Sequence, residues 1–266
     1  MSVLVDGKPE EIPGVLTRSP HEDQKLQLNR EDYAVRPRRS DGTFVRVRGI
    51  VFHTTEGRWP QVVWPTAGKP GGAERYIARS KVDHRCAAAH LWIDRDGVTF
   101  CSSDLLSTQT HHATSVNPLT IGIEIVQGPD GALYRPQIEA AVLVTDWATR
   151  HPRFRIQRQT VDHYRGALSR LATGAGRDFV GVYGHRDQTT NRGRGDPGDA
   201  IFDALEAAGY ERFNVAAKED LERWKSRQTV LGFRGADVDG IPLDKTCDAL
   251  EASGKKHGLW VARPGD

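Results

Sequence analysis

This chain has few cysteines and a small net charge. Its 266 residues include three cysteines, an odd and scattered set that excludes a disulfide framework. The 37 basic residues nearly balance the 35 acidic ones, so the formal net charge is only +2. No overall positive field therefore points to nucleic acid as a partner, and the local cluster Arg36-Pro37-Arg38-Arg39 is interpreted as part of a solvated arm.

Long hydrophobic runs are also missing. The first residues lack the basic flank and apolar stretch of a signal peptide, and no run reaches the roughly 18 residues that a membrane span needs. We therefore expect a protein made in the cytoplasm, without a recognisable signal peptide and without a membrane partner. The oligomeric state stays open.

Three segments of the chain differ in pattern. Residues 1–42 are polar, arginine-rich and interrupted by proline, with no sustained period, which predicts an extended N-terminal arm. Residues 43–216 mix strand and helix patterns, which predicts an α/β domain with a central mixed β-sheet flanked by helices. Residues 217–266 predict a small helical C-terminal appendage, too short to bury much core of its own.

The expected elements of the middle segment follow from apolar runs and turn signals. An Asp-Arg-Asp-Gly sequence at 94–97 predicts a hairpin turn, and Pro136 suits the first turn of a helix. The strands are expected at 44–54, 91–93, 98–100, 120–126 and 179–183, and the helices around 73–79, from 136 onward and over 199–208.

Two histidines follow apolar runs, and an aspartate lies in a glycine-rich loop after the second. His53 ends the first run, His185 ends the second, and Asp196 could fold back beside His185. Two imidazoles and a carboxylate suit a catalytic zinc, which takes three protein ligands and keeps a fourth position for water. Alternatively, the histidines are satisfied polar groups at strand ends, and Asp196 caps the helix that begins near Pro197.

A carboxylate interrupts the apolar strand at 121–125. Glu124 projects from the face opposite to the three isoleucines of that strand, because successive side chains alternate. A charged group in an apolar strand is costly unless it is paired or functional. Glu124 is therefore interpreted as the group that moves protons near the metal, with an ion pair to an arginine as the alternative.

Two further histidines are candidates for binding substrate. His111 and His112 are adjacent, so in extended chain only one of them can face the site, and His112 is the better candidate. His90, which precedes an expected strand, lines the same cavity or is a hydrogen-bonded core histidine.

Five motifs together carry a resemblance that none carries alone, and it spans about residues 45–210. The motifs are, in order, "IVFHTTEG", "AAAHLWIDRDGVTF", "HHA", "TIGIEIV" and "GHRD" followed by "RGRGDPGDAIF". With these motifs the chain resembles the zinc-dependent N-acetylmuramoyl-L-alanine amidases of the type 2 amidase and peptidoglycan-recognition family. That resemblance implies a mixed sheet flanked by helices, with Zn²⁺ in a surface groove of a catalytic domain at 43–216.

The resemblance also implies roles for particular residues. It makes His53, His185 and Asp196 the zinc ligands and Glu124 the catalytic glutamate. Ala89 replaces the tyrosine that some phage members carry before His90, so the chain resembles the glutamate-using branch. Arg194 stands where that branch has a lysine, and its fixed charge suits stabilisation of an oxyanion.

The function implied is hydrolysis of the amide bond between N-acetylmuramic acid and the L-alanine of peptidoglycan. The substrate is either intact cell wall, as for an endolysin, or soluble muropeptide, as for a cytosolic recycling enzyme. Residues 217–266 faintly resemble one peptidoglycan-binding repeat. This resemblance favours intact cell wall over soluble muropeptide as the substrate. A non-catalytic peptidoglycan-binding protein on the same fold is an alternative, and a metal-dependent nuclease is a weaker one whose first sign would be salt-sensitive DNA binding.

Overall fold

The computed structural model describes most of the chain up to Phe213 and a few separated positions beyond it. The described residues are 2–30, 33–55, 72–81, 88–127, 131–161, 180–188, 196–213 and scattered positions between 222 and 234. The predicted helical appendage at 217–266, with its possible peptidoglycan-binding-like repeat, lies almost wholly outside them. Across the described residues, no helix combines the length and apolar character needed to cross a membrane.

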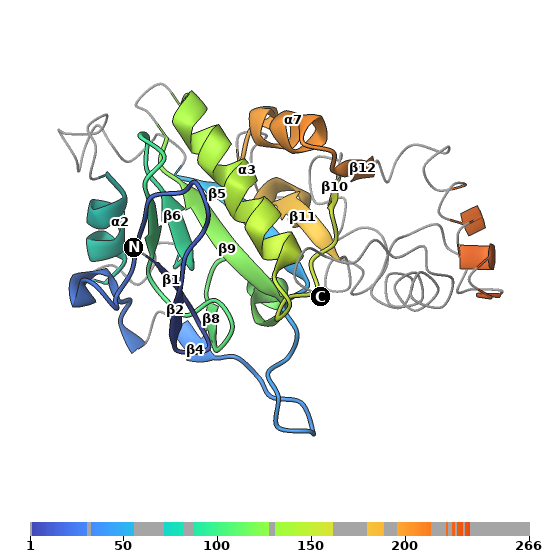
Figure 1. The fold of residues 1–266 in the computed structure, drawn as a ribbon, viewed down its shortest axis with the longest axis horizontal. Coiled ribbons are helices and arrows are strands. Elements are labelled where there is room, and N and C mark those ends of the chain that lie inside the picture. The colour runs from blue at the N-terminus through green and yellow to red at the C-terminus, as the bar shows by residue number, and fades with distance from the viewer. Residues whose placement is uncertain are drawn as a thin grey trace.

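An eight-stranded mixed sheet forms the centre of the molecule, as predicted (Figure 1). All neighbouring strands in it are parallel except the β6–β7 hairpin. In spatial order the strands are β12 (Glu211–Phe213), β10 (Gln159–Val161), β11 (Gly181–Gly184), β5 (Gly49–Thr54), β9 (Thr120–Ile125), β6 (Leu91–Ile93), β7 (Thr99–Cys101) and β3 (Thr17–Arg18).

The two longest strands, β5 and β9, lie side by side in the middle of this sheet. Their register runs from Gly49 opposite Thr120 to Thr54 opposite Ile125, and every residue of both strands is buried. Parallel strands covered on both faces are typically continuous apolar runs, and both sequences have that form. The strand predicted at 44–54 is shorter, because the chain before it folds back in a bridge between Arg38 and Phe44.

Helices cover both faces of the sheet. Figure 1 shows α3 (Arg135–Arg150) lying diagonally across one face, with α7 (Asp199–Ala207) beside it. The buried side of α3 packs with the isoleucines of β9 in one core cluster. A second cluster joins α2 (Gly72–Ser80) to Trp92 and Phe100 of the β6–β7 hairpin. The described residues also form the short helices η1 (Gln24–Leu26), η3 (Thr114–Leu119) and α6 (His185–Gln188).

The residues predicted as an extended arm pack onto the domain as short strands. β1 (Val3–Val5) and β2 (Lys8–Glu10) form a hairpin, β3 joins the edge of the main sheet, and β4 (Tyr33–Val35) pairs with β8 (Thr108–Thr110). Strands of two or three residues are too short to show a period of two, so the sequence pattern does not reveal them. The boundaries of the three predicted segments stay predictions.

For Arg36 the interpretation as a solvated arm is wrong. Its side chain is only 1% exposed. The guanidinium donates hydrogen bonds to the carbonyls of Leu106 (2.9 Å), Pro118 and Thr120 (3.3 Å). Burial lowers the pKa of Arg36 to about 10, which leaves it charged near neutral pH. The carbonyl oxygens replace the water that a buried cation would otherwise lose.

Packing between α3 and the sheet yields a stability prediction. Ile123→Ala should lower the free energy of unfolding by about 2–5 kcal/mol, because it opens a cavity under the helix in the central strand. Leu143→Ala on α3 is the control, since that side chain is 40% exposed. Chemical denaturation of both variants measures the difference, and equal losses would contradict the core assignment.

Candidate active site

Three predicted ligands meet at the carboxyl ends of adjacent strands. His53 is the fifth residue of β5, and His185 directly follows β11, which pairs with β5. Asp196 reaches the same point from the loop before α7. One possible ligand atom from each of these three buried residues lies within 4.8 Å of the other two. The parallel register therefore brings together the two strand-end histidines that the sequence singled out.

The distances within this group suit a metal of small radius. Asp196 Oδ2 lies 3.3 Å from His185 Nδ1, and Oδ1 lies 4.0 Å from His53 Nδ1. The two imidazole centroids are 4.5 Å apart, with the rings edge to face. Tetrahedral zinc with bonds of about 2.0 Å separates its ligand atoms by about 3.3 Å. Two nitrogens and one oxygen at these separations fit the donor set of a three-ligand zinc site.

Backbone contacts fix Asp196 in this position. Its Oδ1 accepts a hydrogen bond from the Thr54 N–H (3.1 Å), and its carbonyl accepts one from the Arg186 N–H (2.9 Å). A side chain at Gly184 would come within 2.7 Å of Pro197, so glycine there allows the loop to lie against β11. The cap of α7 is Gly198, which excludes the alternative that Asp196 caps that helix.

Glu124 lies on β9, the strand next to His53, which belongs with His185 and Asp196 to the group that could hold a metal. It stands opposite His53 in the β5–β9 register, and side chains paired in this way lie on the same face. Glu124 is buried, yet it does not belong to the group of three that could hold a metal. This arrangement suits a carboxylate that acts near a metal without binding it.

His112 packs edge-on against His53, with ring centroids 5.6 Å apart. Its Nε2 lies 2.8 Å from the Thr120 hydroxyl, and its Nδ1 lies 3.0 Å from the Thr110 hydroxyl. The Thr120 hydroxyl donates to the Val116 carbonyl, so it accepts from the Nε2–H of His112. Burial lowers the pKa of His112 to about 3, and the ring is therefore neutral at physiological pH.

His90 is fully buried, and its ring centroid lies 5.6 Å from that of His112. Its Nδ1 accepts a hydrogen bond from the Gly122 N–H (3.0 Å), and its Nε2 lies 3.2 Å from the Thr108 carbonyl. Complete burial holds its pKa well below the usual value. Of the two alternatives raised by the sequence, a hydrogen-bonded core histidine accounts for these contacts.

The remaining predicted residue, Arg194, lies outside the described residues. Its role at an oxyanion stays a prediction.

Sequence reasoning overlooked the part that Gly122 plays. A Cβ at this position would come within 2.5 Å of His112 Cγ, so the imidazole occupies the space that a side chain would need. A signal was present, because Gly122 precedes Glu124 by two residues and therefore shares its face of the strand. A glycine inside a strand often marks such a close approach.

The fold and this geometry agree with a family match. Residues 43–199 match the model of the N-acetylmuramoyl-L-alanine amidase family, and the chain belongs to that family. A comparison with curated protein sequences finds no match.

Several solved structures are similar in fold. AmpD, solved as a selenomethionine derivative, is 16% identical with a TM-score of 0.45, over 74% of this chain and 95% of that one. Peptidoglycan recognition protein SD of Drosophila is 13% identical with a TM-score of 0.45, over 74% and 96%. The amidase LysC of Clostridium intestinale is 12% identical with a TM-score of 0.41, over 74% and 97%.

The contact between Gly122 and His112 yields a second stability prediction. Gly122→Ala should lower the free energy of unfolding by about 1–3 kcal/mol. The added methyl group would displace the His112 imidazole and strain its hydrogen bond to Thr120. Gly198→Ala is the control for added volume, since a Cβ there meets nothing within 4 Å, and its cost is limited to the weaker N-cap that alanine gives α7. Thermal melts of the two variants measure the effect, and a stability of Gly122→Ala equal to wild type would contradict the described packing.

Proposed function

We propose that this chain is a zinc-dependent N-acetylmuramoyl-L-alanine amidase of the glutamate-using branch. It hydrolyses the amide bond between N-acetylmuramic acid and the L-alanine of the stem peptide. The observation that carries the proposal is the buried group of His53, His185 and Asp196 with Glu124 beside it, in a member of this family.

The three ligands would hold Zn²⁺ and leave one coordination position open. A zinc ion in such a site supplies a Lewis acid and lowers the pKa of a bound water to about 7. The chain itself contributes a rigid ligand set. Asp196 is tied to Thr54 by a backbone hydrogen bond, and His53 is supported along its edge by His112. Such support keeps first-shell ligands in their orientation.

Glu124 is proposed to transfer the proton. Its carboxylate accepts a proton from the attacking water and then delivers that proton to the leaving amine of L-alanine. Its place opposite His53 supports the assignment, because a general base must lie within reach of the water that it activates. Arg194 is proposed to stabilise the oxyanion of the tetrahedral intermediate with its permanent charge.

The contacts of His112 leave it a more limited role than the direct substrate binding that the sequence predicted. Both of its ring nitrogens lie within hydrogen-bond distance of threonine hydroxyls, and the ring is buried. We therefore propose that His112 positions His53 and forms the floor under the substrate. His90 supports His112 from behind, since the two rings are neighbours.

The proposed partners are peptidoglycan or muropeptide, with no nucleic acid and no membrane. Intact wall is the preferred substrate, because residues 217–266 resemble a wall-binding repeat. We propose that it acts there after release or delivery.

Metal content tests the ligand assignment. His53→Ala, His185→Ala and Asp196→Ala should each lose most of the bound zinc, because two ligands rarely hold the ion. His111→Ala is the matched control, since that histidine is exposed and adjacent to the site. Elemental analysis of the purified proteins gives the zinc content. Full occupancy in all three ligand variants would show that the assignment is wrong.

Turnover tests the role of Glu124. Glu124→Gln should keep its zinc and lose on the order of 10²- to 10⁴-fold in turnover, because the amide cannot accept the proton. Mass spectrometry of a peptidoglycan digest identifies the products. Wild-type protein should release stem peptides that begin with L-alanine, and released sugars would mean a glycosidase instead.

Two further outcomes of the same digest are decisive. Turnover like that of wild type in Glu124→Gln would refute the proton-transfer role. Binding of peptidoglycan with no released products from the zinc-loaded wild-type protein would favour the non-catalytic alternative.

A further inference from the structure

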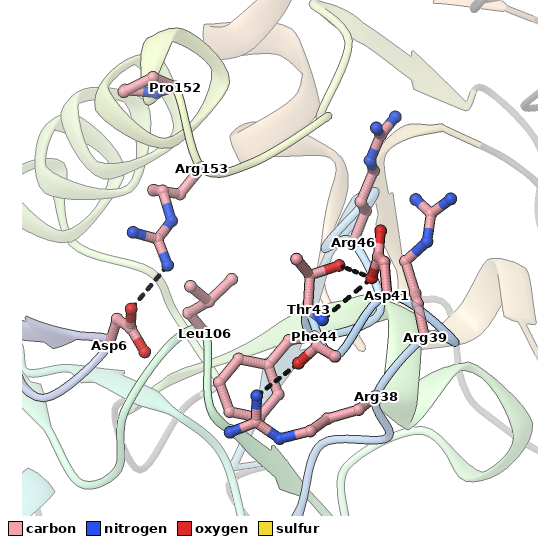
Figure 2. A pocket seen from close by; sticks show the side chains of 11 residues that line it. Asp6, Arg38, Arg39, Asp41, Thr43, Phe44, Arg46, Leu106, Pro152 and Arg153 are labelled. Carbon is pink, nitrogen blue, oxygen red and sulfur yellow. Dashed lines mark hydrogen bonds and ion pairs between the residues drawn. The ribbon is translucent and has the colours of Figure 1, made fainter.

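A cavity of about 510 Å³ lies between the N-terminal hairpin, the chain before β5 and the end of α3 (Figure 2). We call it the arginine pocket, because Arg38, Arg39, Arg46 and Arg153 all line it. Two aspartates also contribute, which leaves a surplus of two positive charges in the lining. The lining is therefore locally basic in a chain whose net charge is only +2.

The arginine pocket is separate from the candidate active site. Arg46 precedes the first residue of β5, whereas His53 lies near the last. Arg153 follows the end of α3. The pocket therefore lies at the amino ends of the central strands, and the metal group lies at their carboxyl ends. Neither metal ligands nor Glu124 line the pocket.

The two carboxylates of the pocket have partners that differ from Arg46, and one of these partners is itself a pocket arginine. Asp6 pairs with Arg153 at 2.6 Å. Asp41 accepts hydrogen bonds from the Thr43 N–H (3.0 Å) and hydroxyl (2.6 Å). Within the described part of the chain, the guanidinium groups of Arg39 and Arg46 form no hydrogen bond or ion pair. Figure 2 shows these two side chains extending in the same direction from the loop that carries them.

The loop that presents these arginines is ordered by its own contacts. Arg38 and Phe44 form an antiparallel bridge, the Arg39 N–H donates to Thr43 O (2.7 Å), and the Gly42 N–H donates to Arg39 O (3.0 Å). The Arg38 guanidinium stacks 4.0 Å above the Phe44 ring and donates to the Gly42 carbonyl. A ligand binding here would therefore lose little free energy to ordering the loop.

We propose that the arginine pocket binds the phosphate group of a phosphorylated polyol or sugar. Guanidinium groups donate paired hydrogen bonds to phosphate oxygens, and Arg39 and Arg46 offer two such groups. The cavity is larger than a single anion requires, and Phe44, Leu106 and Pro152 give it apolar surface for a carbon skeleton. A carboxylate carries less charge and fewer acceptor oxygens, so it should bind more weakly than a phosphate ester of the same skeleton.

Calorimetric titration of the full chain with glycerol 3-phosphate tests the proposal. Arg39→Gln/Arg46→Gln should weaken binding at least tenfold relative to wild type. The control is Arg18→Gln/Arg135→Gln, which removes the same charge from exposed positions outside the pocket. Control binding should stay within about twofold of wild type, and raised salt should weaken wild-type binding because the contacts are ionic.

Two more probes define the ligand class. Glycerate, which has a carboxylate in place of the phosphate ester, should bind at least tenfold more weakly than glycerol 3-phosphate. A poly(glycerol phosphate) chain distinguishes the source of the phosphate. Tighter binding per phosphate than the monoester means a phosphodiester polymer, and weaker binding means a small phosphate monoester.

Several results would overturn the proposal. They are no binding by the wild-type chain, equal losses in the two double variants, and equal affinity for glycerate. Any of them would leave the four arginines as a solvated surface. Zinc content and amidase turnover of Arg39→Gln/Arg46→Gln should match wild type, so failure here is distinguishable from failure of the proposed amidase function.

Discussion

The parallel pairing of β5 with β9 and β11 is the constraint on which the candidate site depends. It aligns the strands so that His53 stands beside Glu124 and close to His185, although these residues are far apart in the sequence. A shift of one residue in either pair would turn a side chain to the opposite face. The apolar runs that bury both faces of these strands fix the register, so core packing and site geometry have the same physical origin.

A buried polar layer supports this site from inside. Arg36, His90 and His112 follow one another toward His53, and backbone carbonyls or threonine hydroxyls satisfy them. Buried polar groups are costly unless they are hydrogen-bonded, and here each has several partners. Arg36 belongs to the N-terminal segment, so that segment contributes to the interior behind the proposed zinc ligands as well as to the edge of the sheet.

The two ends of the central strands have different chemistry. Imidazole and carboxylate groups gather at the carboxyl ends, where the chain leaves β5 and β11. Guanidinium groups gather at the amino ends, where the chain enters β5 and leaves α3. The sheet separates these sites, so one can bind an anion without crowding the other. A protein of nearly neutral net charge thereby has a locally basic surface at one end of the strands and, at the other end, a group of side chains that could hold a metal.

The sequence by itself determined the central elements and the choice of candidate ligands. The apolar runs at 50–52 and 121–125 and the helix start at Pro136 are local signals, and the structure has a strand or helix at each, although β5 is shorter than the strand predicted at 44–54. Only the tertiary structure decided that β3 joins the main sheet and that Gly122 makes room for His112. It also decided that Arg36 is buried, because the carbonyls that receive its hydrogen bonds are 69 to 84 residues away in the chain. Such contacts depend on which distant segments become neighbours, and no local period encodes that.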